Sequence, residues 1–182
     1  MNTIVFNQTT THVITNCNFD CLSPAVLISL YQDGRVFSHF IERWLPSIYS
    51  GLTHIPGCEK YDHVNSENAN IKYDQKTFTK GGCKFMPSNM IGEGRKFDPV
   101  IFKEKTANLN YIIVSNVNFP EIKIRFVTGV ELADKYPNGK IPFTKFNEFF
   151  DEIVSPPQER NKKNVISIEN VITPSESGSE LH

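Results

Sequence analysis

The stretch from Pro56 to Thr79 has the pattern of a β-hairpin, and this pattern restricts the possible folds more than any other part of the chain. After the turn-forming pair Pro56-Gly57, the residues Tyr61 to Val64 form a short extended segment. A polar cluster from Asn65 to Asn70 follows, and then Ile71 to Thr79, which is rich in aromatic and β-branched residues. Two such runs on either side of a polar turn predict a pair of antiparallel strands.

Three segments predict helices. Ser23-Pro24 combines an N-cap residue with a proline at the first helical position, and it predicts a short helix that continues to Asp33. Apolar residues recur at helical spacing from about Arg35 to Leu45, and Pro46 is expected to end this second helix. The third helix is expected over Phe143 to Ile153, where four apolar residues fall on one face.

Four further segments predict strands. Tyr111 to Ser115 is the most hydrophobic of them and is expected at the centre of a sheet. Glu121 to Val127 alternates between apolar and charged residues, which predicts a strand with one face open to water. The other candidates are the N-terminal segment up to about Phe19, as a strand or an extended arm, and Val165 to Val171. The expected fold is therefore α/β (α+β), with a central mixed β-sheet flanked by helices.

The length of 182 residues suits one domain, which is large enough to bury a core without disulfides or metals. This domain is expected over residues 1–154, and residues 155–182 are expected to form a partly disordered C-terminal extension. No apolar run is long enough to span a bilayer, and the first residues lack the basic segment of a secretory signal. A cytoplasmic protein without membrane contact is expected.

The balance of charged residues argues against one class of function. The chain has 19 basic and 20 acidic residues and a net charge of -1. A protein that coats nucleic acid without specificity would be strongly basic. The balance is compatible with an enzyme that combines a local basic surface with acids that bind a metal.

The four cysteines leave two interpretations open. In a reducing compartment they are free thiols. Alternatively, the Cys17-x3-Cys21 and His54-x3-Cys58 spacings place two pairs of ligands within reach of one zinc ion.

The predicted hairpin gathers the residue types that hydrolysis of a phosphodiester requires. The period of two in a β-strand places Asp74 and Lys76 on one face, while Asp62 lies at the start of the partner strand. Carboxylates bind the divalent cation that lowers the pKa of the attacking water. A lysine beside the nucleophile offsets the charge that grows on phosphorus. We therefore expect Asp62, Asp74 and the backbone carbonyl of Gln75 to be metal ligands.

The pattern Asp62 followed by Asp74-Gln75-Lys76 resembles the PD-(D/E)-x-K nuclease superfamily, and within it the small type II restriction endonucleases. The resemblance covers roughly Gly34 to Phe143. It departs from the family pattern at two points, because Tyr61 replaces proline before the first acid and the second acid is Asp where Glu is commoner. The resemblance implies a restriction-endonuclease-like core, Mg2+ bound by the two acids, Lys76 in contact with the attacking water, and Glu42 as an assisting catalytic acid.

The implied function is sequence-specific, Mg2+-dependent cleavage of double-stranded DNA by a type II restriction enzyme. Such enzymes act as two-fold dimers on palindromic sites, so a homodimer is expected. The helical stripe Val36, Phe40 and Trp44 is a candidate for either the core or the dimer surface. Glycines permit close approach to phosphates in the segment that follows the hairpin. The residues expected to contact DNA there are Lys80, Lys84, Ser88, Asn89, Arg95 and Lys96.

Three alternatives remain open. Asp98, Glu121 and Lys123 also form an acid followed by a Glu-x-Lys sequence, and they are a second candidate for the active site. A repair or junction nuclease that selects DNA by its shape would share the fold and the chemistry. A non-enzymatic DNA- or protein-binding accessory protein would use the acids only as a solvated strand face.

Overall fold

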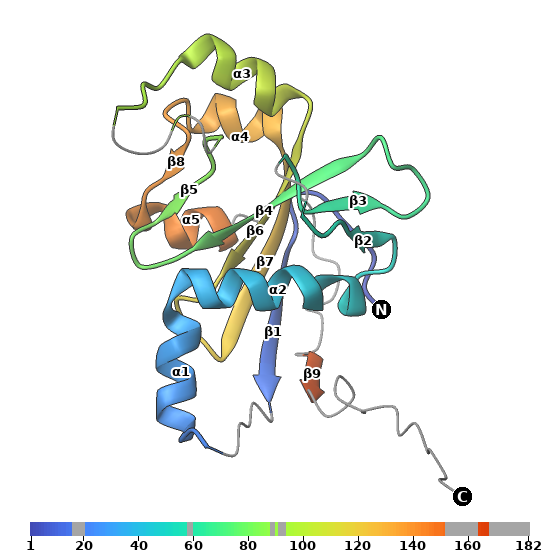
Figure 1. Ribbon diagram of the computed structural model, residues 1–182, viewed down its shortest axis with the longest axis vertical. Coiled ribbons are helices and arrows are strands. Elements are labelled where there is room, and N and C mark those ends of the chain that lie inside the picture. Colours follow the sequence, from blue (N-terminus) through green and yellow to red (C-terminus); the bar gives the residue numbers. More distant parts are fainter. Residues whose placement is uncertain (16–20, 58–59, 88–89, 91–93, 152–163, 168–182) are drawn as a thin grey trace, which may run out of the picture.

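The protein contains a curled, mixed β-sheet flanked by helices (Figure 1). The computed structural model describes residues 1–15, 21–57, 60–87, 90, 94–151 and 164–167. The sheet has seven strands in the order β2-β3-β4-β6-β7-β1-β9. Their bounds are β1 (Thr9–Thr15), β2 (Leu52–His54), β3 (His63–Asn65), β4 (Lys72–Phe78), β6 (Asn110–Ser115), β7 (Glu121–Thr128) and β9 (Asn164–Ser167).

The described residues also form five α-helices and a small second sheet. The helices are α1 (Pro24–Gln32), α2 (Gly34–Ile48), α3 (Pro99–Ala107), α4 (Gly129–Lys135) and α5 (Phe146–Asp151), with a 3-10 turn over Phe143–Lys145. Strands β5 (Cys83–Lys84) and β8 (Lys140–Ile141) pair with each other outside the main sheet. None of the helices in the described part of the chain is long and apolar enough to cross a membrane.

The pairing of β4 determines where the candidate site lies. β4 is antiparallel to β3 on one side and parallel to β6 on the other. The parallel pair requires a crossover, and α3 lies within the connection that provides it (Figure 1). β6 and β7 are antiparallel neighbours, which places β6 at the centre of the sheet as expected.

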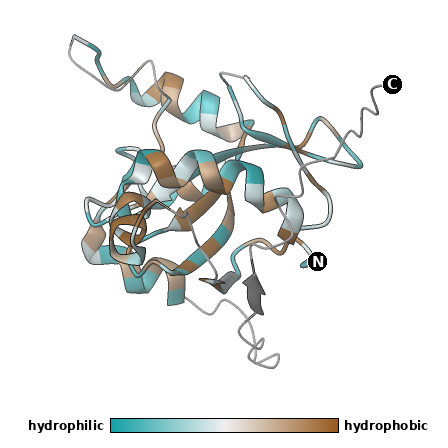
Figure 2. Ribbon diagram, turned by 60° about the horizontal axis from the view of Figure 1, so that its bottom comes forward, coloured by the Kyte–Doolittle hydropathy of each residue, from teal (hydrophilic) through white to brown (hydrophobic). Residues whose placement is uncertain are grey.

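The two faces of the sheet belong to two hydrophobic clusters. Ile112 and Val114 of β6 pack with α2, whereas Tyr111 and Ile113 of the same strand pack with α3, α4 and α5. Figure 2 shows hydrophobic residues concentrated on the central strands. Trp44 of α2 is buried, so this part of the helical stripe belongs to the core.

The predicted end of the second helix is wrong, because α2 continues through Pro46 to Ile48. A proline in a helix lacks the N–H group that would bond to the carbonyl four residues earlier. That carbonyl belongs to Glu42, and it accepts a hydrogen bond of 2.8 Å from Nε2 of His63. A side chain outside the helix thus satisfies the carbonyl, and the helix can continue.

The expectation that β7 has one face open to water is also wrong. Arg125 is buried and donates to the carbonyl of Phe149 in α5. Lys123 donates to the carboxylate of Asp151, which is the last residue of the same helix. α5 covers this face at Lys123 and Arg125, so these two charged side chains bind the helix.

Candidate active site

Asp62 lies at the end of the hairpin ladder, directly before β3. Its backbone N–H donates to the carbonyl of Tyr73 at 2.9 Å. Its carboxylate accepts the backbone N–H of Gln75 at 2.6 Å. The carboxylate therefore points along β4 and lies beside the Asp74-Gln75-Lys76 segment, as the hairpin pattern predicts.

Asp74 and Lys76 share one face of β4 and form an ion pair of 2.5 Å between Oδ1 and Nζ. Their side chains are 15% and 28% exposed, so solvent screens the pair only partly. On this face they adjoin the hydrophobic cluster that contains Cys83 and Tyr111. The charge of Asp74 helps to raise the pKa of both of these side chains, which places them near the pair. The pair therefore lies where the apolar interior meets the surface.

This cluster holds more negative than positive charge. Burial raises the pKa of Asp74, and Asp62 adds to the rise, although the ammonium of Lys76 opposes it. Burial acts to lower the pKa of Lys76, but the carboxylates of Asp74 and Asp62 outweigh this effect and the pKa is raised. When both acids are ionised, two carboxylates beside one ammonium favour the approach of a further cation.

Glu42 lies within electrostatic reach of this cluster. Burial and the charge of Asp62 both raise the pKa of Glu42, which is on α2. Its side chain is 19% exposed and lies 3.7 Å from the imidazole of His39. Glu42 therefore faces the hairpin, as expected for an assisting acid.

His63 adjoins the site and was not predicted from the sequence. It follows Asp62 in the chain, is fully buried, and lies opposite Tyr73 in the β3–β4 ladder. Burial lowers the pKa of His63, which favours the neutral ring, and within the described part of the chain only Nε2 of the ring has a hydrogen-bond partner. Pro46 was the available signal, because a proline inside a helix leaves one carbonyl in need of an outside donor.

The carboxylates match the chemistry of Mg2+, although they do not enclose a metal. Among the described residues, no three His, Cys, Asp or Glu side chains lie close enough together to hold a metal ion by themselves. Mg2+ prefers hard oxygen ligands, keeps several water molecules and is commonly bound by one or two carboxylates. Asp62 and Asp74 supply that donor set. In the zinc interpretation, Cys17 and Cys58 lie outside the described residues, and Cys21 is an exposed free thiol.

The alternative set of Asp98, Glu121 and Lys123 has other structural roles. The carboxylate of Asp98 caps α3 by accepting the N–H groups of Val100 and Ile101. Lys123 pairs with Asp151. In Figure 1 the start of α3 and the start of β7, where Glu121 lies, are at opposite ends of the sheet. Asp98 is therefore not brought together with Glu121.

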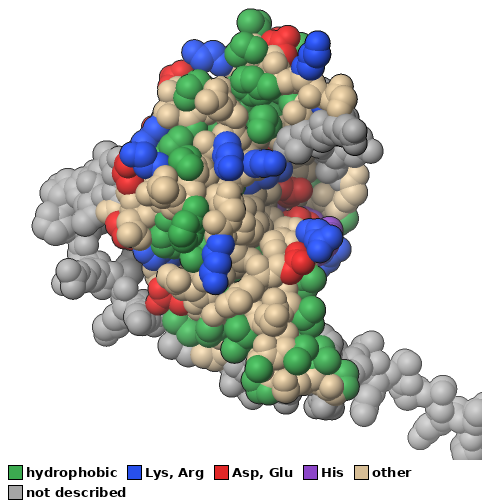
Figure 3. Space-filling model, turned by 90° about the vertical axis from the view of Figure 1, so that its left-hand side faces the viewer, with side chains coloured by type: hydrophobic (Ala, Val, Ile, Leu, Met, Phe, Trp, Pro, Cys, Tyr) green, Lys and Arg blue, Asp and Glu red, His purple; other side chains and the backbone are tan. Residues whose placement is uncertain are grey.

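Four of the six residues expected to contact DNA are described, and all four are exposed, namely Lys80, Lys84, Arg95 and Lys96. Ser88 and Asn89 lie outside the described residues. Lys84 of β5 is directly opposite Lys140 of β8, a basic neighbour 56 positions later that local sequence patterns do not reveal. Figure 3 shows Lys and Arg side chains spread in separate groups over the face that carries β5 and β8.

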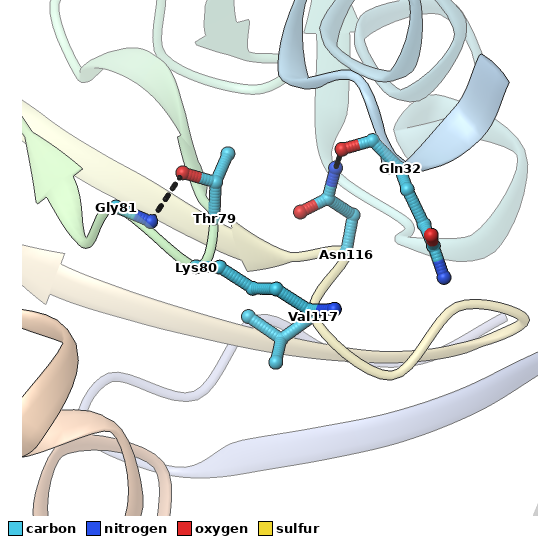
Figure 4. A pocket seen from close by; sticks show the side chains of 6 residues that line it. All are labelled: Gln32, Thr79, Lys80, Gly81, Asn116 and Val117. Carbon is cyan, nitrogen blue, oxygen red and sulfur yellow. Dashed lines mark hydrogen bonds between the residues drawn. The ribbon is translucent and has the colours of Figure 1, made fainter. Parts of the chain in front are cut away.

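A cavity of about 160 Å3 lies beyond the carboxyl ends of β4 and β6 (Figure 4). Its shape is fixed by Asn116, whose amide donates to the carbonyls of Tyr31 and Gln32 at the end of α1. The lining residues are Gln32, Thr79, Lys80, Gly81, Asn116 and Val117. Lys80 follows Asp74 by six positions, or roughly 20 Å along an extended chain. The cavity is therefore separate from the acidic cluster.

The comparisons with known proteins found no match, whether by family models, by curated protein sequences or by solved structures.

Proposed function

We propose that the protein is a Mg2+-dependent endonuclease that hydrolyses phosphodiester bonds of double-stranded DNA, with a restriction-endonuclease-like core. The observation that carries the proposal is the hairpin cluster of Asp62, Asp74 and Lys76, in which two carboxylates adjoin one lysine at a partly exposed position. The order of α2, three antiparallel strands, the α3 crossover and β6 agrees with such a core.

The role of each residue follows from its position. Asp62 and Asp74 would hold Mg2+, and Glu42 would assist from α2. When bound, Mg2+ lowers the pKa of a water molecule and binds a phosphate oxygen. Lys76 carries its ammonium beside Asp74, where it can orient the attacking water and offset charge on the phosphate. The backbone carbonyl of Gln75 completes the proposed ligand set.

The surface around the site would bind the DNA backbone. Lys84 and Lys140 lie opposite each other on β5 and β8. Cys83, which precedes Lys84 on β5, lies within electrostatic reach of the site, because the charges of Lys76 and Asp74 act on its thiol. Two exposed lysines at one ladder position repel each other and are suited to a phosphate. We further propose a cytoplasmic restriction enzyme that acts as a homodimer, since one site per subunit cuts one strand each.

Cleavage of supercoiled plasmid in the presence of Mg2+ tests the proposal. We expect discrete linear fragments, no cleavage with EDTA, and loss of cleavage in Asp74→Ala and Lys76→Ala. Lys72→Ala is the matched control, because Lys72 lies on the same strand and packs over the ring of Tyr61. Its cleavage should be unchanged.

The products separate the alternatives. Smeared products would favour a nuclease that selects DNA by shape or without specificity. No cleavage by the folded protein would favour a binding protein. Full cleavage by either site variant would show that the active site lies elsewhere.

A further inference from the structure

Pro46 leaves one backbone oxygen of α2 without its helical partner. In an α-helix the N–H of residue 46 bonds to the carbonyl of residue 42, and proline has no N–H. Nε2 of His63 lies 2.8 Å from the carbonyl oxygen of Glu42. A carbonyl can only accept a hydrogen bond, so His63 donates and carries its proton on Nε2.

This hydrogen bond connects the two elements that carry the acids. His63 is the first residue of β3 and follows Asp62 directly. The oxygen that it binds belongs to Glu42, whose carboxylate feels the charge of Asp62. The ring is fully buried, and its bond to α2 is therefore shielded from competing water.

We infer that His63 is a positioning residue that holds Glu42 and Asp62 at a fixed separation by donating to the carbonyl that Pro46 leaves free. This inference rests on the proposed function, since it concerns the same cluster of acids. His63 would touch neither metal nor DNA. It acts through the backbone of Glu42 and through its covalent link to Asp62.

Two effects of His63 can be separated, because Pro46→Ala restores the missing N–H. Loss of the ring in His63→Leu leaves a partly buried carbonyl without its partner, which destabilises the fold. In the double variant, the alanine introduced at position 46 provides a helical partner for the carbonyl. The double variant therefore regains stability but still lacks the connection between α2 and β3.

The first measurement is a double-mutant cycle of unfolding in denaturant. We expect His63→Leu to raise the unfolding equilibrium constant at least roughly tenfold more in the unchanged chain than in the chain that carries Pro46→Ala. His54→Leu is the matched control, because its ring lies 5.4 Å from the His63 ring and belongs to the opposite residue of β2. It should show no coupling to Pro46. Equal effects of His63→Leu in both chains would overturn the inferred hydrogen bond.

The second measurement is the affinity for Mn2+ alone, followed by calorimetry, which does not depend on cleavage. We expect His63→Leu/Pro46→Ala to bind Mn2+ about tenfold or more weakly than the unchanged protein, in the range of losses seen when residues that support metal ligands are removed. His63→Gln keeps an N–H donor and should retain most of the affinity. This double variant carries the test even if His63→Leu alone fails to fold.

The outcomes distinguish this inference from the proposed function. If the double variant regains both stability and Mn2+ affinity, His63 has a purely structural role and the inference is wrong. If the unchanged protein does not bind Mn2+, the positioning role is also wrong. If the unchanged protein binds Mn2+ in a His63-dependent way but leaves DNA intact, the nuclease proposal fails and the role of His63 stands.

Discussion

Replacement of Lys76 by methionine should destabilise the protein strongly, although methionine fills a similar volume. The substitution removes the cation that lies 2.5 Å from Asp74 and leaves two neighbouring carboxylates without it. Breaking a fully buried pair costs about 3–5 kcal/mol, whereas exposed pairs contribute about 0–1 kcal/mol. Because these side chains are 15% and 28% exposed, we expect a loss of about 2–3 kcal/mol near neutral pH.

The loss should depend on pH in a defined direction. Burial and Asp62 raise the pKa of Asp74 above its ordinary value of 3.8, and loss of Lys76 raises it further. A carboxyl with a raised folded-state pKa contributes stability that is fully present below the unfolded-state pKa and is lost as the pH rises through the folded-state pKa. The deficit of Lys76→Met should therefore be larger at about pH 8 than at about pH 5.

Denaturant unfolding of Lys76→Met at these two pH values, with and without Ca2+, is the assay. A cation bound by Asp62 and Asp74 replaces the missing charge, so Ca2+ should reduce the deficit. Lys123→Met is the matched control, since its partner Asp151 is 57% exposed and the expected loss is about 1 kcal/mol or less. A Lys76→Met protein as stable as the unchanged one at both pH values would refute this reasoning about the cluster.

Three further variants test the structure and the site. Asp98→Ala removes the N-cap of α3 and should lower the free energy of unfolding by about 1 kcal/mol, measured by thermal unfolding. Plasmid cleavage should be unchanged. Loss of cleavage in a folded variant would indicate that Asp98 belongs to the active site. Gly129→Ala would place a Cβ in steric overlap with the carbonyl oxygen of Thr106, and it should cost about 3 kcal/mol or more; near-normal unfolding would contradict this packing. The double variant Lys80→Ala/Lys84→Ala should bind DNA with a weaker salt dependence, and the slope of the logarithm of the binding constant against the logarithm of the salt concentration should fall in magnitude by about 2. DNA titration without a divalent metal measures this slope. An unchanged slope would show that neither lysine contacts DNA.

The hairpin could be predicted because its information is local. The polar turn from Asn65 to Asn70 fixes which residues face each other, and the period of two fixes the shared face of Asp74 and Lys76. The sequence could not show that Asp62 bonds to the backbone of Gln75, since this contact depends on where the ladder of β3 ends. It also could not show how deeply the pair is buried.

The α3 crossover was missed although its signal is present. Asp98-Pro99 has the same N-cap and proline arrangement as Ser23-Pro24, which predicts the start of α1. The carboxylate of Asp98 caps α3, although its place before a Glu-x-Lys sequence also fits a site acid. The apolar periodicity of α3 is weak, and only Phe102 and Thr106 of this helix are buried. The Asp98-Pro99 cap is therefore the clearest sequence signal for the helix.

The burial of Arg125 could not be predicted from β7 itself. Alternation shows that one face of a strand is polar, but it does not show whether a distant segment covers that face. The cover comes from Phe149 and Asp151 in α5, more than twenty positions later. Likewise, the continuation of α2 past Pro46 depends on His63, a residue from another element.

The two strands of the hairpin, β3 directly after Asp62 and β4 with Asp74, differ in how firmly they are held. β3 has three residues and its outer neighbour β2 also has three, whereas β4, β6 and β7 form long ladders at the centre of the sheet. Short edge ladders open locally at a low free-energy cost, without global unfolding. Amide hydrogen exchange should therefore be faster in β3 than in β4, and Asp62 would take its place beside Asp74 only in the closed form. Metal binding at the site then depends on a local opening equilibrium at the edge of the sheet. A bound divalent cation would shift this equilibrium towards the closed form. Protection of the Gln75 amide from hydrogen exchange would report the shift, because this amide donates to Asp62.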